Sequence, residues 1–142
     1  MARILVLEDE ERSREALRNM LCRISADITV NTAADLAQAR LLLHGTVSFD
    51  LFLLDVNLVK EDKEDSSGLI FAEEIRNIIK YEFTPVVMIT SVASLEIDAY
   101  RRIHCYQYLL KPYSEADVQA VVKKVLSHGR AEEKPYIIVK KN

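Results

Sequence analysis

The sequence predicts one α/β domain built around a doubly wound sheet of five parallel strands. Three observations support this fold class. Strand-like and helix-like segments alternate along most of the 142-residue chain. The strand-like segments are apolar with no clean alternation, as expected when helices cover both faces of a sheet. Several strands also stop at a residue that can bind a metal or a phosphate, which is typical of the carboxyl edge of such a sheet.

The strands are predicted from short apolar or β-branched runs, and the helices from apolar residues at helical spacing. The predicted strands cover residues 3–7, 28–32, 49–54, 86–89 and 106–110. Two predicted helices bury the sets Ala16, Leu17, Met20, Leu21, Ile24 and Phe71, Ala72, Ile75, Ile78, Ile79. Two more cover residues 35–44, which Gly45 terminates, and residues 94–103. The last begins at a capping box formed by Ser114 and Asp117 and ends at Gly129.

Composition narrows the class of protein. The chain is 49% apolar and 29% charged with a net charge of −3, which is ordinary for one soluble globular domain. No basic stripe indicates nucleic-acid binding, and no apolar stretch approaches the length of a membrane helix or a signal peptide. We therefore expect a cytoplasmic protein that does not bind a membrane. Cys22 and Cys105 are expected to be buried free thiols, and the scattered histidines do not suggest a zinc site.

The last residues differ in composition from the rest of the chain. We assign residues 1–129 to the main domain and residues 130–142 to a charged linker followed by a strand-like run over 135–139. That run could pair with an edge of the sheet, or it could open a second domain. The second interpretation is favoured, because the five-stranded sheet is already complete without it.

The polar residues at the strand ends carry the chemistry. Glu8 and Asp9 follow the first strand, Asp55 the third, Thr90 the fourth and Lys111 the fifth. Parallel strands bring these ends to one edge of the sheet, so three carboxylates and one ammonium should meet there. A divalent cation relieves repulsion among carboxylates, and oxygen ligands favour Mg²⁺, Mn²⁺ or Ca²⁺.

Each side chain of this cluster also has a candidate role. Asp9 and Asp55 can bind the metal directly, and Glu8 can hold a metal-bound water. Asp55 can act as a nucleophile toward phosphorus, because aspartate forms acyl phosphates. Lys111 supplies positive charge and Thr90 a hydroxyl donor. Taken singly, these residues have ordinary structural explanations, such as a helix cap or a surface charge. Their shared position at the strand ends is what favours a site.

These residues resemble the receiver domain of two-component response regulators over about residues 3–128. The resemblance is carried by the run Leu7-Glu8-Asp9-Glu10, by Asp55 and Thr90 after apolar strands, and by Tyr108-Leu109-Leu110-Lys111-Pro112. It implies a flavodoxin-like fold with strand order 2-1-3-4-5. It also implies a signalling switch that assists only its own phosphorylation and dephosphorylation, and is not otherwise an enzyme.

The resemblance assigns roles to further residues. Asp55 would accept a phosphoryl group from a sensor histidine kinase, with Mg²⁺ or Mn²⁺ bound by Asp9, Asp55 and the backbone carbonyl of Asn57. Thr90 and Tyr108 would form the switch. The Lys111–Pro112 bond would be cis. Homodimer formation is left open.

Two positions are expected to tune the lifetime of the phosphoryl group. They are Asn57, two residues after the acceptor, and Val92, two residues after Thr90. The apolar side chain of Val92 has no group that can form a hydrogen bond with an attacking water. Self-dephosphorylation is therefore expected to be slower than in the chemotaxis-type members of the family.

The sequence departs from the family pattern after the acceptor. Leu58 is followed by Val59 where a proline is usual, and Gly68 arrives about five residues late because extra residues lie within the stretch 60–65. This acidic insertion is either a solvated loop or a lid that alters partner choice. The run over 134–142 resembles the start of a LytTR-type DNA-binding domain. DNA would then be bound only through an output domain outside this chain, giving a transcription regulator.

Three other classes of protein are alternatives to a receiver domain. A phosphohydrolase of the haloacid-dehalogenase type would need a second aspartate at position 57, where this chain has asparagine. A nucleotide-binding protein is disfavoured, because no glycine-rich loop follows the first strand. A receiver-like interaction module that is never phosphorylated remains an alternative.

Overall fold

A computed structural model describes residues 2–58, 65–91 and 93–132, with side chains as far as residue 127. Its strands are β1 (Ala2–Leu7), β2 (Ile28–Ala33), β3 (Leu51–Leu54), β4 (Val86–Thr90) and β5 (Gln107–Leu110). Its helices are α1 (Glu11–Cys22), α2 (Leu36–Leu43), α3 (Ser67–Arg76), α4 (Glu96–Arg102) and α5 (Glu115–Glu132). Two short 3₁₀ turns, η1 (Ile79–Tyr81) and η2 (Ala93–Leu95), precede β4 and α4.

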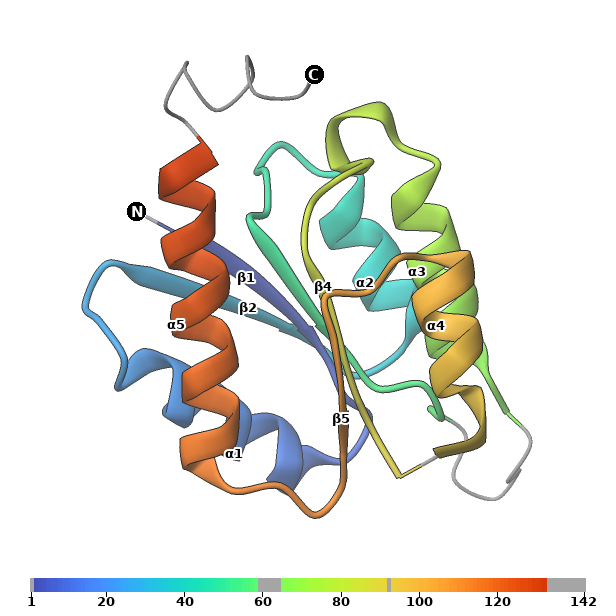
Figure 1. Cartoon of the computed structure of the whole chain (residues 1–142), viewed down its shortest axis with the longest axis horizontal. Coiled ribbons are helices and arrows are strands. Elements are labelled where there is room, and N and C mark those ends of the chain that lie inside the picture. The colour runs from blue at the N-terminus through green and yellow to red at the C-terminus, as the bar shows by residue number, and fades with distance from the viewer. Residues whose placement is uncertain (1, 59–64, 92, 133–142) are drawn as a thin grey trace.

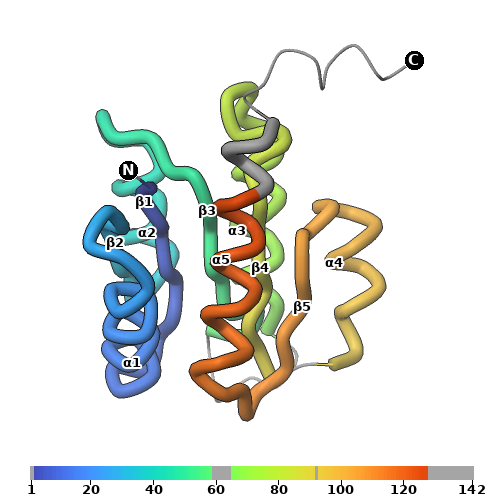
Figure 2. The backbone as a smooth tube through the Cα atoms, turned by 60° about the vertical axis from the view of Figure 1, so that its left-hand side comes forward, coloured from blue at the N-terminus to red at the C-terminus, as the bar shows by residue number. Residues whose placement is uncertain are grey.

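The strands form one parallel sheet in the order β2-β1-β3-β4-β5, which confirms the predicted fold class. Figure 1 shows the sheet between two layers of helices, with α1 and α5 on one face and α2, α3 and α4 on the other. Figure 2 shows the two layers from a second direction. The central strands β3 and β4 are buried along their whole length, which requires such cover on both faces of the sheet.

The core is accordingly split into two apolar clusters, one on each face of the sheet. Successive residues of a strand point to opposite faces, so Leu5 and Leu7 pack beneath α2 and α3 while Ile4 and Val6 pack beneath α1 and α5. This explains why β3 and residues 4–7 of β1 are apolar throughout. In these two strands, polar side chains can follow only at the carboxyl end.

The register of the strands aligns their carboxyl ends. Leu7 pairs with Leu54 across β1 and β3, and Leu54 pairs with Met88 across β3 and β4. Thr90 pairs with Leu110 at the end of β4 and β5. The next residue along each of β1, β3 and β5 is therefore Glu8, Asp55 and Lys111, at one edge of the sheet.

Several local predictions can be compared with the structure. The capping box at the start of α5 is confirmed, since the Asp117 amide donates to Ser114 Oγ at 3.0 Å and the Ser114 amide to Asp117 Oδ2 at 3.3 Å. The predicted end of this helix at Gly129 is wrong, because α5 continues to Glu132. A glycine inside a helix costs only about 1 kcal/mol, and the residues after it are good helix formers.

Two further predictions about apolar residues are wrong. Helix α3 ends at Arg76, so Ile78 and Ile79 lie beyond it, and Ile79 is 89% exposed. Cys22 is exposed at the last position of α1, whereas Cys105 is buried as predicted. Leu17 and Leu21 take the buried stripe of α1, and the residue after Leu21 is rotated by about 100° away from that stripe.

Within the described residues, no helix combines the length and apolar character that crossing a membrane requires. Some sequence predictions concern positions outside the described residues. These are Val92, the extra residues 60–64 of the insertion, and the strand-like run over 135–139.

Candidate functional site

The backbone just beyond the strands fixes where the acidic side chains begin. The Asp55 amide donates to the carbonyl oxygen of Leu7 at 2.9 Å, and the Glu8 amide donates to the carbonyl oxygen of Ala33 at 3.1 Å. These bonds extend the sheet ladder by one residue beyond β3 and β1. The Glu8 and Asp55 side chains are consequently held in the sheet edge, where they are 1% and 2% exposed.

Lys111 links the two buried carboxylates. Its Nζ lies 2.8 Å from Glu8 Oε1 and 3.1 Å from Asp55 Oδ2. Burial raises the pKa of Glu8, and the hydrogen bond from Lys111 only partly opposes this effect. Burial alone would lower the pKa of Lys111, but its bonds with Glu8 and the charge of Asp55 outweigh it, so the pKa is raised. Lys111 therefore stays a cation beside Asp55.

The donor set suits a hard divalent cation. Carboxylate oxygens of Glu8, Asp9 and Asp55 all lie within 4.8 Å of one another. Three carboxylates against one ammonium leave net negative charge, and oxygen donors without nitrogen or sulfur favour Mg²⁺ or Mn²⁺. The residues present thus fit the metal that the sequence resemblance implies. The third predicted ligand, Asn57, follows closely, and its amide donates to Asp55 Oδ1 at 3.2 Å.

The predicted switch residues lie on β4 and β5, next to the acidic cluster. Thr90 is fully buried, and its carbonyl oxygen accepts a hydrogen bond from the Lys111 amide at 2.8 Å. Tyr108 is buried in the core cluster that contains α3 and α4 residues. Burial, followed by the charge of Glu96, raises its pKa to about 12. The Tyr108 amide donates to the Tyr100 hydroxyl of α4 at 3.1 Å, which joins β5 to that helix.

The structure brings together most of the predicted site residues. Glu8, Asp9, Asp55 and Lys111 meet at the edge, with Thr90 and Asn57 beside them in the chain or sheet. The Lys111–Pro112 bond is cis, the isomer that the resemblance implies. Val92, the second tuning position, lies outside the described residues.

Three residues contact the backbone around the acidic cluster, and these contacts are not predicted from the sequence. Arg14 Nη1 donates to the carbonyl oxygens of Glu8 at 3.0 Å and Asp9 at 3.2 Å. Asp65 accepts from the Leu58 amide beside Asn57. Gly68 packs against the backbone of Asp55, where a Cβ would fall 1.8 Å from its carbonyl oxygen. Of these, only the late position of Gly68 left a signal in the sequence.

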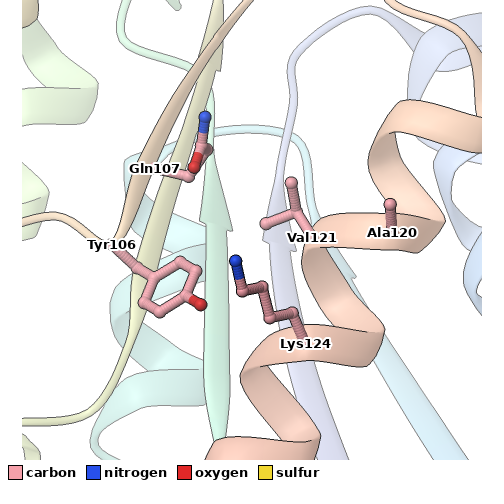
Figure 3. Close-up of a pocket in the computed structure, with 5 residues that line it drawn as sticks. All are labelled: Tyr106, Gln107, Ala120, Val121 and Lys124. Atoms are coloured by element: carbon pink, nitrogen blue, oxygen red, sulfur yellow. The ribbon is translucent and has the colours of Figure 1, made fainter.

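A separate pocket of about 400 Å³ lies between β5 and α5. Figure 3 shows Tyr106 and Gln107 on one side of it and Val121 and Lys124 on the other. Tyr106 and Gln107 stand at the amino end of β5, whereas Lys111 follows its carboxyl end. This pocket is therefore separate from the acidic site.

Comparisons with known proteins agree with the fold and the site. Residues 4–123 match the response regulator receiver domain family. A chemotaxis protein CheY homologue of Campylobacter jejuni is 25% identical over 135 residues, which cover 92% of this chain and 96% of that protein.

Solved structures give the same result. The chemotaxis response regulator CheY4 of Vibrio cholerae is similar with a TM-score of 0.73 and 26% identity, over 88% of this chain and 98% of that one. The response regulator TrrA of Thermotoga maritima, solved in complex with Mg²⁺-BeF, is similar with a TM-score of 0.69 and 26% identity, over 88% and 99% of the two chains.

The chain therefore belongs to the response regulator receiver domain family. It is the CheY-like receiver domain of a two-component response regulator, a class of signalling modules and not of conventional enzymes. Such domains interact with histidine kinases and bind Mg²⁺ at an acidic pocket. The cluster of Glu8, Asp9 and Asp55 is the acidic group of this chain.

Proposed function

We propose that this chain is a phosphorylation-dependent switch in which Asp55 accepts the phosphoryl group of a sensor histidine kinase. The observation that carries the proposal is the Lys111 ammonium, held between Asp55 and Glu8 at 3.1 and 2.8 Å. A phosphoryl group on Asp55 adds negative charge at a point where a cation is already fixed. Electrostatic stabilisation of this kind, together with positioning, supplies most of the catalysis in phosphoryl transfer.

The transfer is a substitution at phosphorus. A carboxylate oxygen of Asp55 forms the new O–P bond while the P–N bond of the kinase phosphohistidine breaks, and the imidazole leaves with the electron pair. Asp9, Asp55 and the Asn57 carbonyl would hold Mg²⁺ or Mn²⁺, with Glu8 acting through a bound water. The metal, when bound, supplies charge that offsets the phosphoryl oxygens. The relative TrrA was solved in complex with Mg²⁺-BeF, which supports the proposal of a Mg²⁺ site in this receiver domain.

The output would follow from residues beside the acceptor. In the proposed switch the Thr90 hydroxyl donates to a phosphoryl oxygen, and Tyr108 occupies the buried side of the sheet when it does so. Tyr108 is already buried, and its amide contacts Tyr100 of α4, so a movement of β4 or β5 is transmitted to α4. The exposed surface of α4, including Ile97, would then change its affinity for a partner.

The site favours storage of the phosphoryl group over turnover. Asn57 occupies the position at which a haloacid-dehalogenase-type hydrolase needs a second aspartate as acid and base. Asn57 and Val92 would set how long the phosphoryl group persists. We further propose a cytoplasmic location and a transcriptional output, with DNA bound only through a LytTR-type output domain. A homodimer is a further proposal.

Intact-mass analysis after incubation with acetyl phosphate and Mg²⁺ tests the proposal. We expect one added phosphoryl group on the wild-type chain and none on Asp55→Asn. Asp50→Asn is the matched control, because Asp50 precedes the same strand at its opposite end. No adduct under conditions that label other receiver domains would favour an interaction module that is not phosphorylated. Turnover of a generic phosphomonoester would favour a hydrolase.

A further inference from the structure

The insertion after the acceptor is closed at its base by one carboxylate. Asp65 Oδ2 accepts a hydrogen bond from the Leu58 amide at 2.9 Å and another from Ser67 Oγ at 2.7 Å. Leu58 lies three residues beyond the acceptor, and Ser67 is the first residue of α3. A single side chain therefore joins the two ends of the inserted segment.

The bond to Leu58 also fixes the carbonyl of Asn57. The Leu58 N–H and the Asn57 C=O belong to the same planar peptide group. Among the described residues only the Lys111–Pro112 bond is cis, so this peptide is trans and its N–H and C=O point in opposite directions. Holding the N–H against Asp65 consequently turns the Asn57 carbonyl oxygen away from Asp65. The Asn57 amide, on its other side, is held by Asp55 Oδ1.

The start of α3 holds the acceptor backbone in the same way. The Gly68 amide donates to the carbonyl oxygen of Val56 at 2.8 Å. A Cβ at Gly68 would lie 1.8 Å from the Asp55 carbonyl oxygen, so α3 approaches the chain as closely as a glycine allows. The segment from Asp55 to Leu58 is thus fixed by Asp65, the last residue of the insertion, and by the start of α3.

We propose that Asp65 is a positioning residue of the metal site, which orients the Asn57 carbonyl through the Asn57–Leu58 peptide. The proposal deepens the proposed function, since it rests on that carbonyl being a ligand of Mg²⁺. It explains how a receiver domain carries extra residues between acceptor and α3 without disturbing the ligand. It also separates two effects of Asp65, the hydrogen bond and the negative charge, which different substitutions remove.

Calorimetric titration with Mg²⁺ alone, without a phosphoryl donor, tests the proposal on three variants. Asp65→Asn keeps an oxygen acceptor at the same place but loses the charge. Asp65→Glu keeps the charge but moves the oxygens by one methylene, and Asp65→Ala loses both. Groups that orient a metal ligand typically contribute at least about tenfold to affinity. We expect Asp65→Glu and Asp65→Ala to weaken Mg²⁺ binding about tenfold. The Mg²⁺ affinity of Asp65→Asn should stay within about threefold of the wild-type affinity.

The control is Asp50→Asn, because Asp50 Oδ2 also accepts a backbone N–H, from Arg3 at 2.8 Å, at the far end of β3. This variant should bind Mg²⁺ like wild type. If Asp65→Asn and Asp65→Ala lose equal Mg²⁺ affinity while Asp65→Glu binds like wild type, only the charge of Asp65 matters. That result would overturn the proposal. Wild-type affinity in all three variants would also overturn it. A wild-type chain that neither binds Mg²⁺ nor accepts a phosphoryl group would instead reject the proposed function itself.

Discussion

Lys111 extends past the end of β4 to place its ammonium 3.1 Å from the Oδ2 atom of Asp55. The two residues follow β5 and β3, which are separated in the sheet by β4. The contact therefore spans three strands, and it depends on the register of each. Any group added to Asp55 must displace or engage this ammonium. That competition makes Lys111 the first residue to test.

Lys111→Met should separate metal binding from phosphoryl transfer. Removing the ammonium leaves the carboxylates more negative, so we expect Mg²⁺ to bind up to about tenfold more tightly. Phosphorylation by acetyl phosphate should slow by at least about tenfold, because a fixed cation is lost from the transition state. Calorimetry and intact-mass kinetics measure the two effects. Lys124→Met, on the exposed side of α5, is the control. Weaker Mg²⁺ binding in Lys111→Met would contradict the prediction.

Arg14→Met should weaken the metal site without removing a ligand. The Arg14 guanidinium holds the carbonyl oxygens of Glu8 and Asp9, so its loss should loosen the loop between β1 and α1. We expect Mg²⁺ affinity to fall about tenfold. Arg12→Met removes an exposed arginine from the same helix and should leave the affinity unchanged. If both variants bind Mg²⁺ alike, the backbone contacts of Arg14 do not matter for the metal.

Gly68→Ala should destabilise the fold near the acceptor. The new Cβ would overlap the Asp55 carbonyl oxygen, which is backbone and cannot rotate away. Overpacking of this kind costs about 3 kcal/mol in the free energy of unfolding. At Gly45 a Cβ would meet its nearest atom at 3.3 Å, so Gly45→Ala should change stability by no more than about 0.5 kcal/mol. Urea denaturation of the two variants gives the comparison, and similar midpoints would argue against the close approach.

Val92→Glu should shorten the lifetime of the phosphoryl group. A carboxylate two residues after Thr90 can hold an attacking water, which valine cannot do. Wild type is expected to lose its phosphoryl group more slowly than the variant after acetyl phosphate is removed. Val92→Leu, which keeps the position apolar, should behave like wild type. Equal rates for Val92→Glu and wild type would remove Val92 from the tuning positions.

The two cysteines should differ in reactivity. Thiolates are the reactive form, and burial raises the pKa of the Cys105 thiol to about 11. At pH 8 iodoacetamide should therefore modify the exposed Cys22 and leave Cys105 largely intact, as peptide mapping would show. In Cys22→Ser, modification of the remaining thiol should increase as the pH rises toward 11. Modification of both thiols at the same rate at pH 8 would contradict the burial of Cys105.

The strand ends could be predicted from the sequence because two simple rules act on them. The ends of the apolar runs show where the strands end. In a parallel sheet, the carboxyl ends of the strands lie at the same edge. The cluster of Glu8, Asp9, Asp55 and Lys111 follows from the two rules together. Arg14 and Asp65 could not be found in this way. Their contacts are with backbone atoms of loops, and the direction of a loop peptide leaves no pattern in side-chain type.

The end of α3 shows a second limit. The apolar spacing continues to Ile79, and no glycine or proline interrupts it. The helix nevertheless ends at Arg76, whose guanidinium donates to the carbonyl oxygens of Ile103 at 2.5 Å and Thr84 at 2.7 Å. Asn77 caps the helix, and these contacts hold its last residue against the rest of the fold. The spacing of apolar residues does not reveal such contacts.

The closed base of the insertion has a consequence for how receiver domains diversify. Asp65 holds the segment from Asp55 to Leu58 through the Leu58 amide, and Gly68 holds it by close packing on Asp55. A change in length or charge between Leu58 and Asp65 that keeps Asp65 in place would leave both contacts intact. The position is accordingly a natural place to graft a new recognition sequence, so that a receiver can change its partners and keep its switch.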